Sequence, residues 1–256
     1  MKKILISIAL VLGNIFTGLC DSQLNIVPAP NKVVKGEGKW VVKNGLTIVS
    51  TDVKDFSANY LQDKLEDVFD FPVVVSSQRK GDGCITFATD KNIPSEGYKL
   101  EVTEKGITIT SSDKSGQYYG MQTLLQLFPA EIYSGDNLRI KEYPIDVLTI
   151  EDAPRFPYRG FMLDVSRTFF DLDYLRNYID WMSSHKLNRL HLHLTDDNGW
   201  RIEIKKYPEL TRKGAWRGQN ELLPPTYLSG AERYGGYYTQ KEMKELIAYA
   251  QERNVM

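Results

Sequence analysis

The stretch from Arg159 to Arg167, Arg-Gly-Phe-Met-Leu-Asp-Val-Ser-Arg, decides the fold of the second half of the chain. Its centre, residues 161–165, is almost continuously apolar, as in a parallel strand that is buried on both faces. Residues 172–187 follow with a helical pattern whose apolar stripe consists of Leu175, Ile179 and Met182. Residues 190–194 then form a second apolar strand. A strand, a helix and a strand in this order predict part of a parallel sheet.

The same rhythm continues to the end of the sequence. Thr239-Gln240-Lys241-Glu242 is a capping-box pattern that predicts a helix running through Glu252. Val255 and Met256 have the character of a third strand. We therefore expect residues 153–256 to fold as a parallel α/β domain.

The first half has a different pattern, which predicts an α+β layer. Residues 46–49 and 73–75 are predicted strands, and residues 56–69 between them are a predicted amphipathic helix. Residues 98–109 are predicted to form a hairpin with its turn at Glu104-Lys105-Gly106, and residues 115–128 to form a helix that stops before Pro129. With the hairpin counted as one unit, the predicted order is β-α-β-β-α. Pro144 and the stretch 153–157 mark the border between the two domains.

Composition limits the possible functions. The chain has 256 residues, is 42% hydrophobic and 25% charged, and so resembles an ordinary soluble protein. Lysine and arginine number 32 against 33 aspartates and glutamates, a net charge of −1. This balance argues against nucleic acid as a partner. Two cysteines exclude a disulfide scaffold, and three histidines leave little for a metal site.

The amino terminus predicts export. Residues 1–20 combine two lysines with an apolar core too short to span a bilayer, which is the pattern of a secretory signal peptide. The mature protein is then expected in the periplasm or outside the cell. Cys20 could carry a lipid anchor, although Leu19 is not the small residue that a lipobox has before its cysteine. No other stretch is apolar enough to predict a transmembrane helix, and Cys84 is expected to be a core residue.

Polar residues gather after both predicted parallel strands, where parallel α/β folds bind their ligands. Arg167 follows the first strand, and Asp196 and Asp197 follow the second. An arginine offers a planar set of donors to hydroxyls or carboxylates, and aspartates accept hydrogen bonds from a polar ligand. An arginine and an aspartate in these places could equally form only a structural ion pair.

His191 and His193 are two residues apart on the second strand and therefore share one face. They could be core groups with satisfied hydrogen bonds, or two ligands of a metal-dependent hydrolase that would need further carboxylate ligands. Trp200 and Trp216 could offer flat faces to sugar rings. The aromatic face of the predicted helix is expected to serve packing; its members are Tyr174, Tyr178 and Trp181.

Residues 159–167, together with His-Leu-His-Leu-Thr-Asp-Asp-Asn-Gly-Trp at 191–200, resemble glycoside hydrolase family 20, the β-N-acetylhexosaminidases. Residues 116–124 resemble the last helix of that family's accessory domain, and residues 235–239 resemble the lead into its second barrel helix. The resemblance extends from about residue 24 to the end. It implies a small α+β accessory domain at 21–152, followed at 153–256 by the first part of a (β/α)8 barrel, truncated at strand 3.

The family removes terminal N-acetylglucosamine or N-acetylgalactosamine from β-linked glycans, and the acetamido group of the substrate serves as the nucleophile. The resemblance implies that Arg167 binds the ring hydroxyls of the terminal sugar, that Asp196 supports the acid/base group, and that His193 shapes the pocket. It implies no cofactor and no metal.

The family's catalytic Asp-Glu pair belongs to strand four, and the resemblance therefore places it beyond Met256. Glu151-Asp152 has the reverse order and is expected to lie in the linker. We thus expect the amino-terminal part of a hexosaminidase, inactive alone. Two other interpretations stay open: a carbohydrate-binding or structural chain without catalysis, and a metal-dependent barrel hydrolase that uses His191 and His193.

Overall fold

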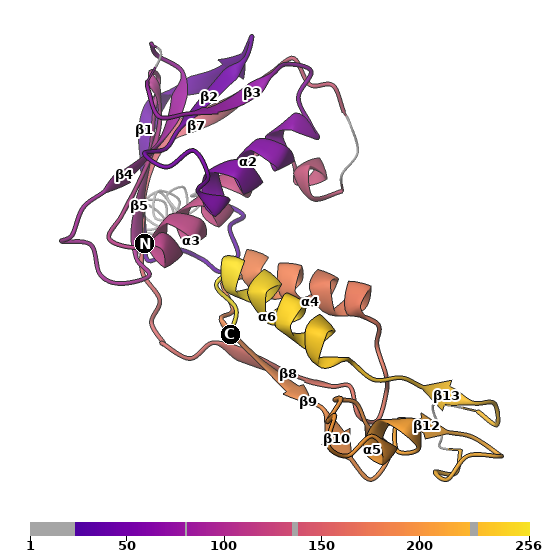
Figure 1. The fold of residues 1–256 in the computed structure, drawn as a ribbon. Helices are drawn as coiled ribbons and strands as arrows, with labels where there is room; N and C mark the ends of the chain where they lie inside the picture. The colour runs from indigo at the N-terminus through magenta and orange to yellow at the C-terminus, as the bar shows by residue number, and fades with distance from the viewer. Residues whose placement is uncertain (1–23, 80, 135–137, 226–229) are drawn as a thin grey trace, which may run out of the picture.

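The computed structural model describes residues 24–79, 81–134, 138–225 and 230–256. The expected signal peptide and Cys20 lie outside these ranges. The described chain forms a sheet-and-helix layer followed by two parallel strands that lie beneath two helices (Figure 1). Within the described ranges, no helix is long and apolar enough to cross a bilayer.

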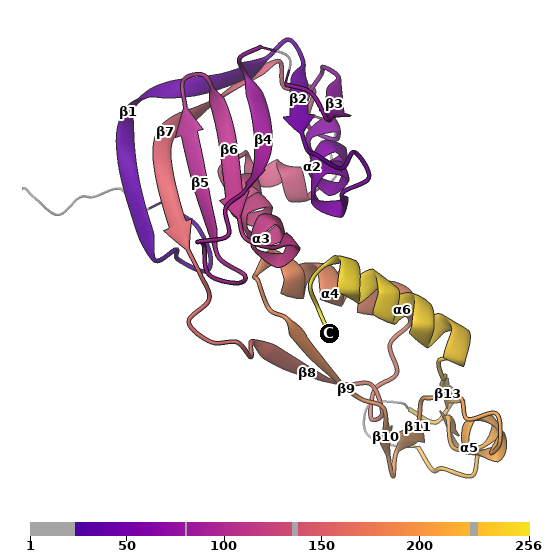
Figure 2. The same ribbon diagram turned by 60° about the vertical axis from the view of Figure 1, so that its left-hand side comes forward.

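The first half is built on a seven-stranded mixed sheet in the order β1-β7-β5-β6-β4-β2-β3. Its strands are β1 (Lys32–Lys43), β2 (Leu46–Val49), β3 (Val73–Ser76), β4 (Cys84–Thr89), β5 (Tyr98–Thr103), β6 (Gly106–Ser111) and β7 (Glu142–Asp152). Helices α2 (Phe56–Glu66) and α3 (Lys114–Leu125) cover one face, and a 3-10 helix, η1 (Ala130–Tyr133), follows (Figure 2). The core between the layers includes Leu61, Leu65, Ile85, Leu100 and Leu124.

The predicted hairpin is confirmed as β5 and β6, and the predicted strands at 46–49 and 73–75 are confirmed as β2 and β3. Cys84 is buried, as expected. Two helices end earlier than predicted, α2 at Glu66 instead of residue 69 and α3 at Leu125 instead of residue 128. The predicted order missed β1, β4 and β7. The sequence of β1 is interrupted by Gly-Glu-Gly at 36–38, where its register with β7 shifts.

Pro144 does not mark a domain border, because it lies inside β7. There it pairs with Val41 of β1, whereas β5 pairs with β7 only from Leu148 onward. A proline is tolerated at this point because, within the described ranges, β1 is the one strand that pairs with β7 here, so no N–H is needed on the other side. Glu151-Asp152 does not lie in a linker either, since these residues end β7 and pair with β5.

The second half begins with two parallel strands, β8 (Gly160–Asp164) and β9 (Arg189–His193), joined by α4 (Leu172–Ser184). The predicted stripe of α4 is buried against α6 (Gln240–Glu252), which opens with the predicted capping box. Short elements lie between them: β10 (Thr195–Asp196), β11 (Gly199–Trp200), α5 (Glu209–Arg212), β12 (Trp216–Arg217) and β13 (Tyr234–Gly235). Met256 exchanges two backbone hydrogen bonds with residues 188 and 190, in the direction expected of a third strand.

The prediction that the first strand is buried on both faces is wrong. Phe161 and Met162 of β8 are 56% and 51% exposed, because β9 is the neighbour with which β8 pairs in the described chain. The prediction that the aromatic residues of α4 serve packing is confirmed for Tyr178, which packs against the core, and for Tyr174, which stacks on Phe170. It is wrong for Trp181, which is 59% exposed.

Candidate functional site

The polar residues predicted after the two strands meet at one place. The guanidinium of Arg167 lies between two carboxylates, with Nη1 2.6 Å from Asp164 Oδ2 and Nη2 2.7 Å from Asp196 Oδ2. Asp164 ends β8, whereas Asp196 follows β9 in the small strand β10. The parallel register pairs Asp164 with His193, so the two strand ends are level. Arg167 thereby joins the carboxyl ends of both strands.

Asp164 is also held by hydrogen bonds from the backbone that follows it. Asp164 Oδ1 accepts the backbone N–H groups of Ser166 and Arg167, which hold the turn after β8. Burial would raise the pKa of Asp164, but the hydrogen bonds from Arg167 outweigh it and lower that pKa below its usual range. Asp164 therefore remains an anion that holds the guanidinium.

Asp196 is the most strongly shifted acid of the site. Its Oδ2 lies 2.8 Å from His193 Nε2, and its Oδ1 accepts the N–H of Asp197. The bond from His193 contributes most, followed by those from Asp197, and together with Arg167 they hold the pKa of Asp196 far below its ordinary value. Asp196 is thus a permanent acceptor at neutral pH.

This arrangement suits the binding of a neutral polar ligand. Half of the Arg167 side chain is exposed (52%), and a guanidinium carries five N–H donors, of which the two carboxylates do not use all. A ligand with adjacent hydroxyls can accept from these donors and donate to carboxylate oxygens nearby. Asp164 was not among the residues predicted from the sequence; its place at the end of the strand, three residues before Arg167, is the signal that could have shown it.

Arg201 holds together the backbone segments next to the site, a role that was not predicted from the sequence. The side chain is fully buried, and its N–H groups donate to the carbonyls of Val165, Ser166, Ala215 and Gly236. Arg201 therefore ties the turn after β8 to the segments around β12 and β13. Glycine is required beside it, because a Cβ on residue 199 would overlap Arg201 Nη2.

The other candidates are less well placed. One face of Trp216 is covered, because the guanidinium of Arg233 stacks 3.5 Å from its ring centre. Trp200 is half-buried and donates its indole N–H to Ile202. His191 shares a face with His193, with 6.5 Å between ring centres. Among the residues the structure describes, no three His, Cys, Asp or Glu side chains come close enough to hold a metal ion.

Two family models match the chain one after the other. Residues 23–153 match "Glycosyl hydrolase family 20, domain 2" and residues 156–256 match "Glycosyl hydrolase family 20, catalytic domain". The chain belongs to glycosyl hydrolase family 20. This is a family of glycosidases, so the resemblance found in the strand-end motifs is confirmed.

Curated relatives agree with the family. The chain is 37% identical to a β-hexosaminidase of Vibrio furnissii over 235 residues, which is 91% of this chain and 36% of that protein. It is also 37% identical to a β-hexosaminidase of Porphyromonas gingivalis, covering 91% of this chain and 29% of the relative. The chain thus spans about a third of the length of the relatives it matches.

A solved structure shows the same fold. The crystal structure of the family 20 exo-β-N-acetylglucosaminidase from Vibrio harveyi, in complex with N-acetylglucosamine, matches with a TM-score of 0.80 at 34% identity. The match covers 91% of this chain and 35% of that chain. The α/β fold of this family 20 member therefore rests on both sequence and structure.

Proposed function

We propose that this chain carries the sugar-hydroxyl-binding part of a β-N-acetylhexosaminidase. The observation that carries the proposal is the guanidinium of Arg167, held between Asp164 and Asp196 at the carboxyl ends of two parallel strands. The substrate would be a glycan that ends in β-linked N-acetylglucosamine or N-acetylgalactosamine. Hydrolysis would retain the anomeric configuration and use the acetamido group of the substrate as nucleophile.

Each site residue has a defined part in this proposal. Arg167 donates to the ring hydroxyls of the terminal sugar, while Asp164 fixes the plane of its guanidinium. Asp196 carries the negative charge that would orient the acid/base group, and His193 holds Asp196 through the bond at Nε2. No cofactor takes part. The acid/base Glu and the Asp that orients the acetamido group would come as an adjacent Asp-Glu pair, which this sequence does not contain.

The domain plan is part of the same proposal. Residues 21–152 would be the accessory domain, and residues 153–256 the first part of a (β/α)8 barrel. Among the described residues β8 pairs with β9 alone, and this supports the plan, since an unpaired strand edge with exposed Phe161 and Met162 requires a cover. Further barrel strands and helices would cover this edge and the aromatic face of α4. We also propose export through the signal peptide at 1–20, with Cys20 as a candidate lipid attachment site.

Retention on immobilised N-acetylglucosamine tests the binding function. We expect the 256-residue chain to be retained and eluted by free N-acetylglucosamine, and Arg167→Ala to pass through. Arg176→Ala is the matched control, because Arg176 forms an exposed ion pair with Asp173 on α4. Retention of the Arg167→Ala protein, or equal loss in both variants, would contradict the proposed pocket.

A chromogenic N-acetylglucosaminide tests the assignment of catalysis. Since the sequence holds no adjacent Asp-Glu pair, we expect the 256-residue chain to release no chromophore. Release of chromophore that disappears in Asp196→Asn but not in Arg176→Ala would show that the chain supplies its own acid, and would refute this part of the proposal.

A further inference from the structure

The two halves of the chain meet at the end of the parallel strands that is opposite to Arg167. The carboxyl ends of helices α4 and α6 and the beginnings of β8 and β9 face helix α3 of the first half (Figures 1 and 2). Tyr118 of α3 forms a hydroxyl–hydroxyl hydrogen bond of 2.7 Å with Ser183 of α4. Arg253, after α6, lies 5.1 Å from the ring centre of Phe56 in α2. The interface thus combines polar and aromatic contacts.

Residues in the left-handed backbone region concentrate at this interface. The described chain has five such residues that are not glycine, and three of them lie here: Glu96, Lys186 and Asn254, with φ between 58° and 61°. The left-handed region is unfavourable for residues with a Cβ, and it persists where surrounding contacts enforce it. In each of the three, the side chain makes a hydrogen bond to the other half of the molecule.

Lys186 is the least expected of the three. It follows the C-cap of α4, a position at which glycine is the usual residue. The side chain is 7% exposed, and Nζ donates to Asp152 Oδ2 at 3.0 Å and to the Tyr98 hydroxyl at 2.8 Å. Burial lowers the pKa of Lys186, and the charge of Asp152 opposes this effect. A lysine at a glycine position is therefore explained by its contacts across the interface.

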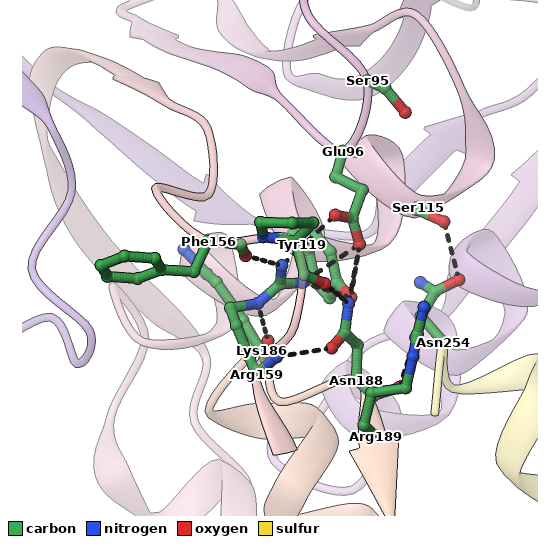
Figure 3. A network of polar contacts seen from close by, with 12 residues as sticks. Ser95, Glu96, Ser115, Tyr119, Phe156, Arg159, Lys186, Asn188, Arg189 and Asn254 are labelled. Atoms are coloured by element: carbon green, nitrogen blue, oxygen red, sulfur yellow. Dashed lines mark hydrogen bonds and ion pairs between the residues drawn. The ribbon is translucent and has the colours of Figure 1, made fainter. Parts of the chain in front are cut away.

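Glu96 joins the beginnings of both strands to the first half (Figure 3). Its carboxylate accepts two N–H groups of Arg159, at 3.1 and 3.3 Å, and the backbone N–H of Glu96 is held by Asp113. Arg159 directly precedes β8 and donates its backbone N–H to the side chain of Asn188, which directly precedes β9. The backbone carbonyl of Asn188 also accepts the N–H of Met256. The residues that precede β8 and β9 and the segment at Met256 are thus linked by one network of hydrogen bonds.

We propose that the first half serves as a built-in template for the second, and that Glu96, Lys186 and Asn254 are the positioning residues that hold the barrel strands in register against it. The seven-stranded sheet has its own large core, so we expect it to stay folded without this contact. The second half has a smaller core and a parallel sheet of two strands, so we expect it to depend on the contact. The role is separate from sugar binding, because it concerns the opposite end of the strands.

Replacing Lys186 by glycine separates this role from simple helix capping, because the two predict opposite signs. If Lys186 only ends α4, glycine relieves the left-handed strain and raises Tm. If Lys186 holds the interface, Lys186→Gly lowers Tm by about 4 °C or more. Asn44→Gly is the matched control, since Asn44 has a φ of 58° in the exposed turn between β1 and β2. We expect Asn44→Gly to leave Tm unchanged or to raise it.

Hydrogen exchange followed by mass spectrometry then locates the loss. We expect Lys186→Gly to accelerate exchange at residues 160–164 and 189–193 about tenfold or more, with residues 106–111 unchanged. Asn254→Gly, which removes the bond from Ser115, should show a smaller change of the same kind and serves if Lys186→Gly does not fold. A rise in Tm for Lys186→Gly, unchanged exchange in both variants, or equal acceleration in both halves would overturn the proposal.

Discussion

Arg201 offers the sharpest test of how the candidate site is held together. The fully buried guanidinium donates to four backbone carbonyls, those of Val165, Ser166, Ala215 and Gly236. In Arg201→Met the side chain keeps its approximate length but has no donor. The variant therefore removes the hydrogen bonds to residues 165–166, 215 and 236 without opening a large cavity.

The size of the effect follows from these four bonds. A hydrogen bond to a charged group contributes about 1.5–3 kcal/mol, and a buried carbonyl left without a donor costs about 1–3 kcal/mol. Two effects work in the opposite direction: burial lowers the pKa of Arg201, and the nearby charge of Arg217 lowers it further. Removing the cation relieves both. We therefore expect a net loss of about 4 kcal/mol, well below the sum of the four bonds.

Thermal unfolding measures this loss. For a chain of this size, about 4 kcal/mol corresponds to a fall in Tm of about 8–16 °C. Arg212→Met is the control, because Arg212 forms an exposed ion pair with Glu209 and should change Tm by less than about 2 °C. A fall for Arg201→Met no larger than that of the control would refute the role assigned to Arg201.

Three further predictions concern single contacts. Gly235→Ala should lower stability by about 3 kcal/mol in denaturant unfolding, because its Cβ would overlap the Ala215 carbonyl oxygen and φ is +139°; a neutral result would refute this. Thr239→Ala should cost about 1 kcal/mol in the same assay, since it breaks the capping box with Glu242; no loss would show that the box is dispensable. Burial raises the pKa of Asp113, but the N–H bonds from Gly116 and residue 96 outweigh burial, so the pKa in the folded protein is below its usual value. The ionised carboxylate therefore stabilises the fold fully above the unfolded-state pKa, and this stabilisation disappears as the pH falls through the folded-state pKa. Asp113→Asn should therefore flatten the acid limb of a plot of Tm against pH, and an unchanged acid limb would contradict this.

The strand-end motifs were predictable because each carries a local signal. The apolar stripe of α4, the capping box of α6 and the polar residues after β9 are all evident within a few residues. Arg167 and Asp196 could be placed together because the carboxyl ends of parallel strands meet at one edge of a sheet. Local pattern and known geometry were sufficient there.

The remaining features depend on contacts between distant segments. β7 continues through Pro144 because at that residue the strand pairs with β1 and not with β5. The sequence 161–165 is apolar enough for a buried strand, but exposure depends on which neighbours are present. The sequence does not show why a lysine occupies the glycine position at residue 186, because its partners, Asp152 and Tyr98, are distant in the chain. No local pattern encodes such partners.

The central claim, that Arg167, held between Asp164 and Asp196, binds a terminal N-acetylhexosamine, is tested most directly by NMR. The ¹⁵N-labelled chain would be titrated with N-acetylglucosamine and N-acetylgalactosamine, and the backbone amide shifts followed. We predict shifts confined to residues 164–167 and 193–197 in the wild-type chain and their loss in Arg167→Ala. Shifts centred elsewhere, or shifts that persist in Arg167→Ala, would contradict it.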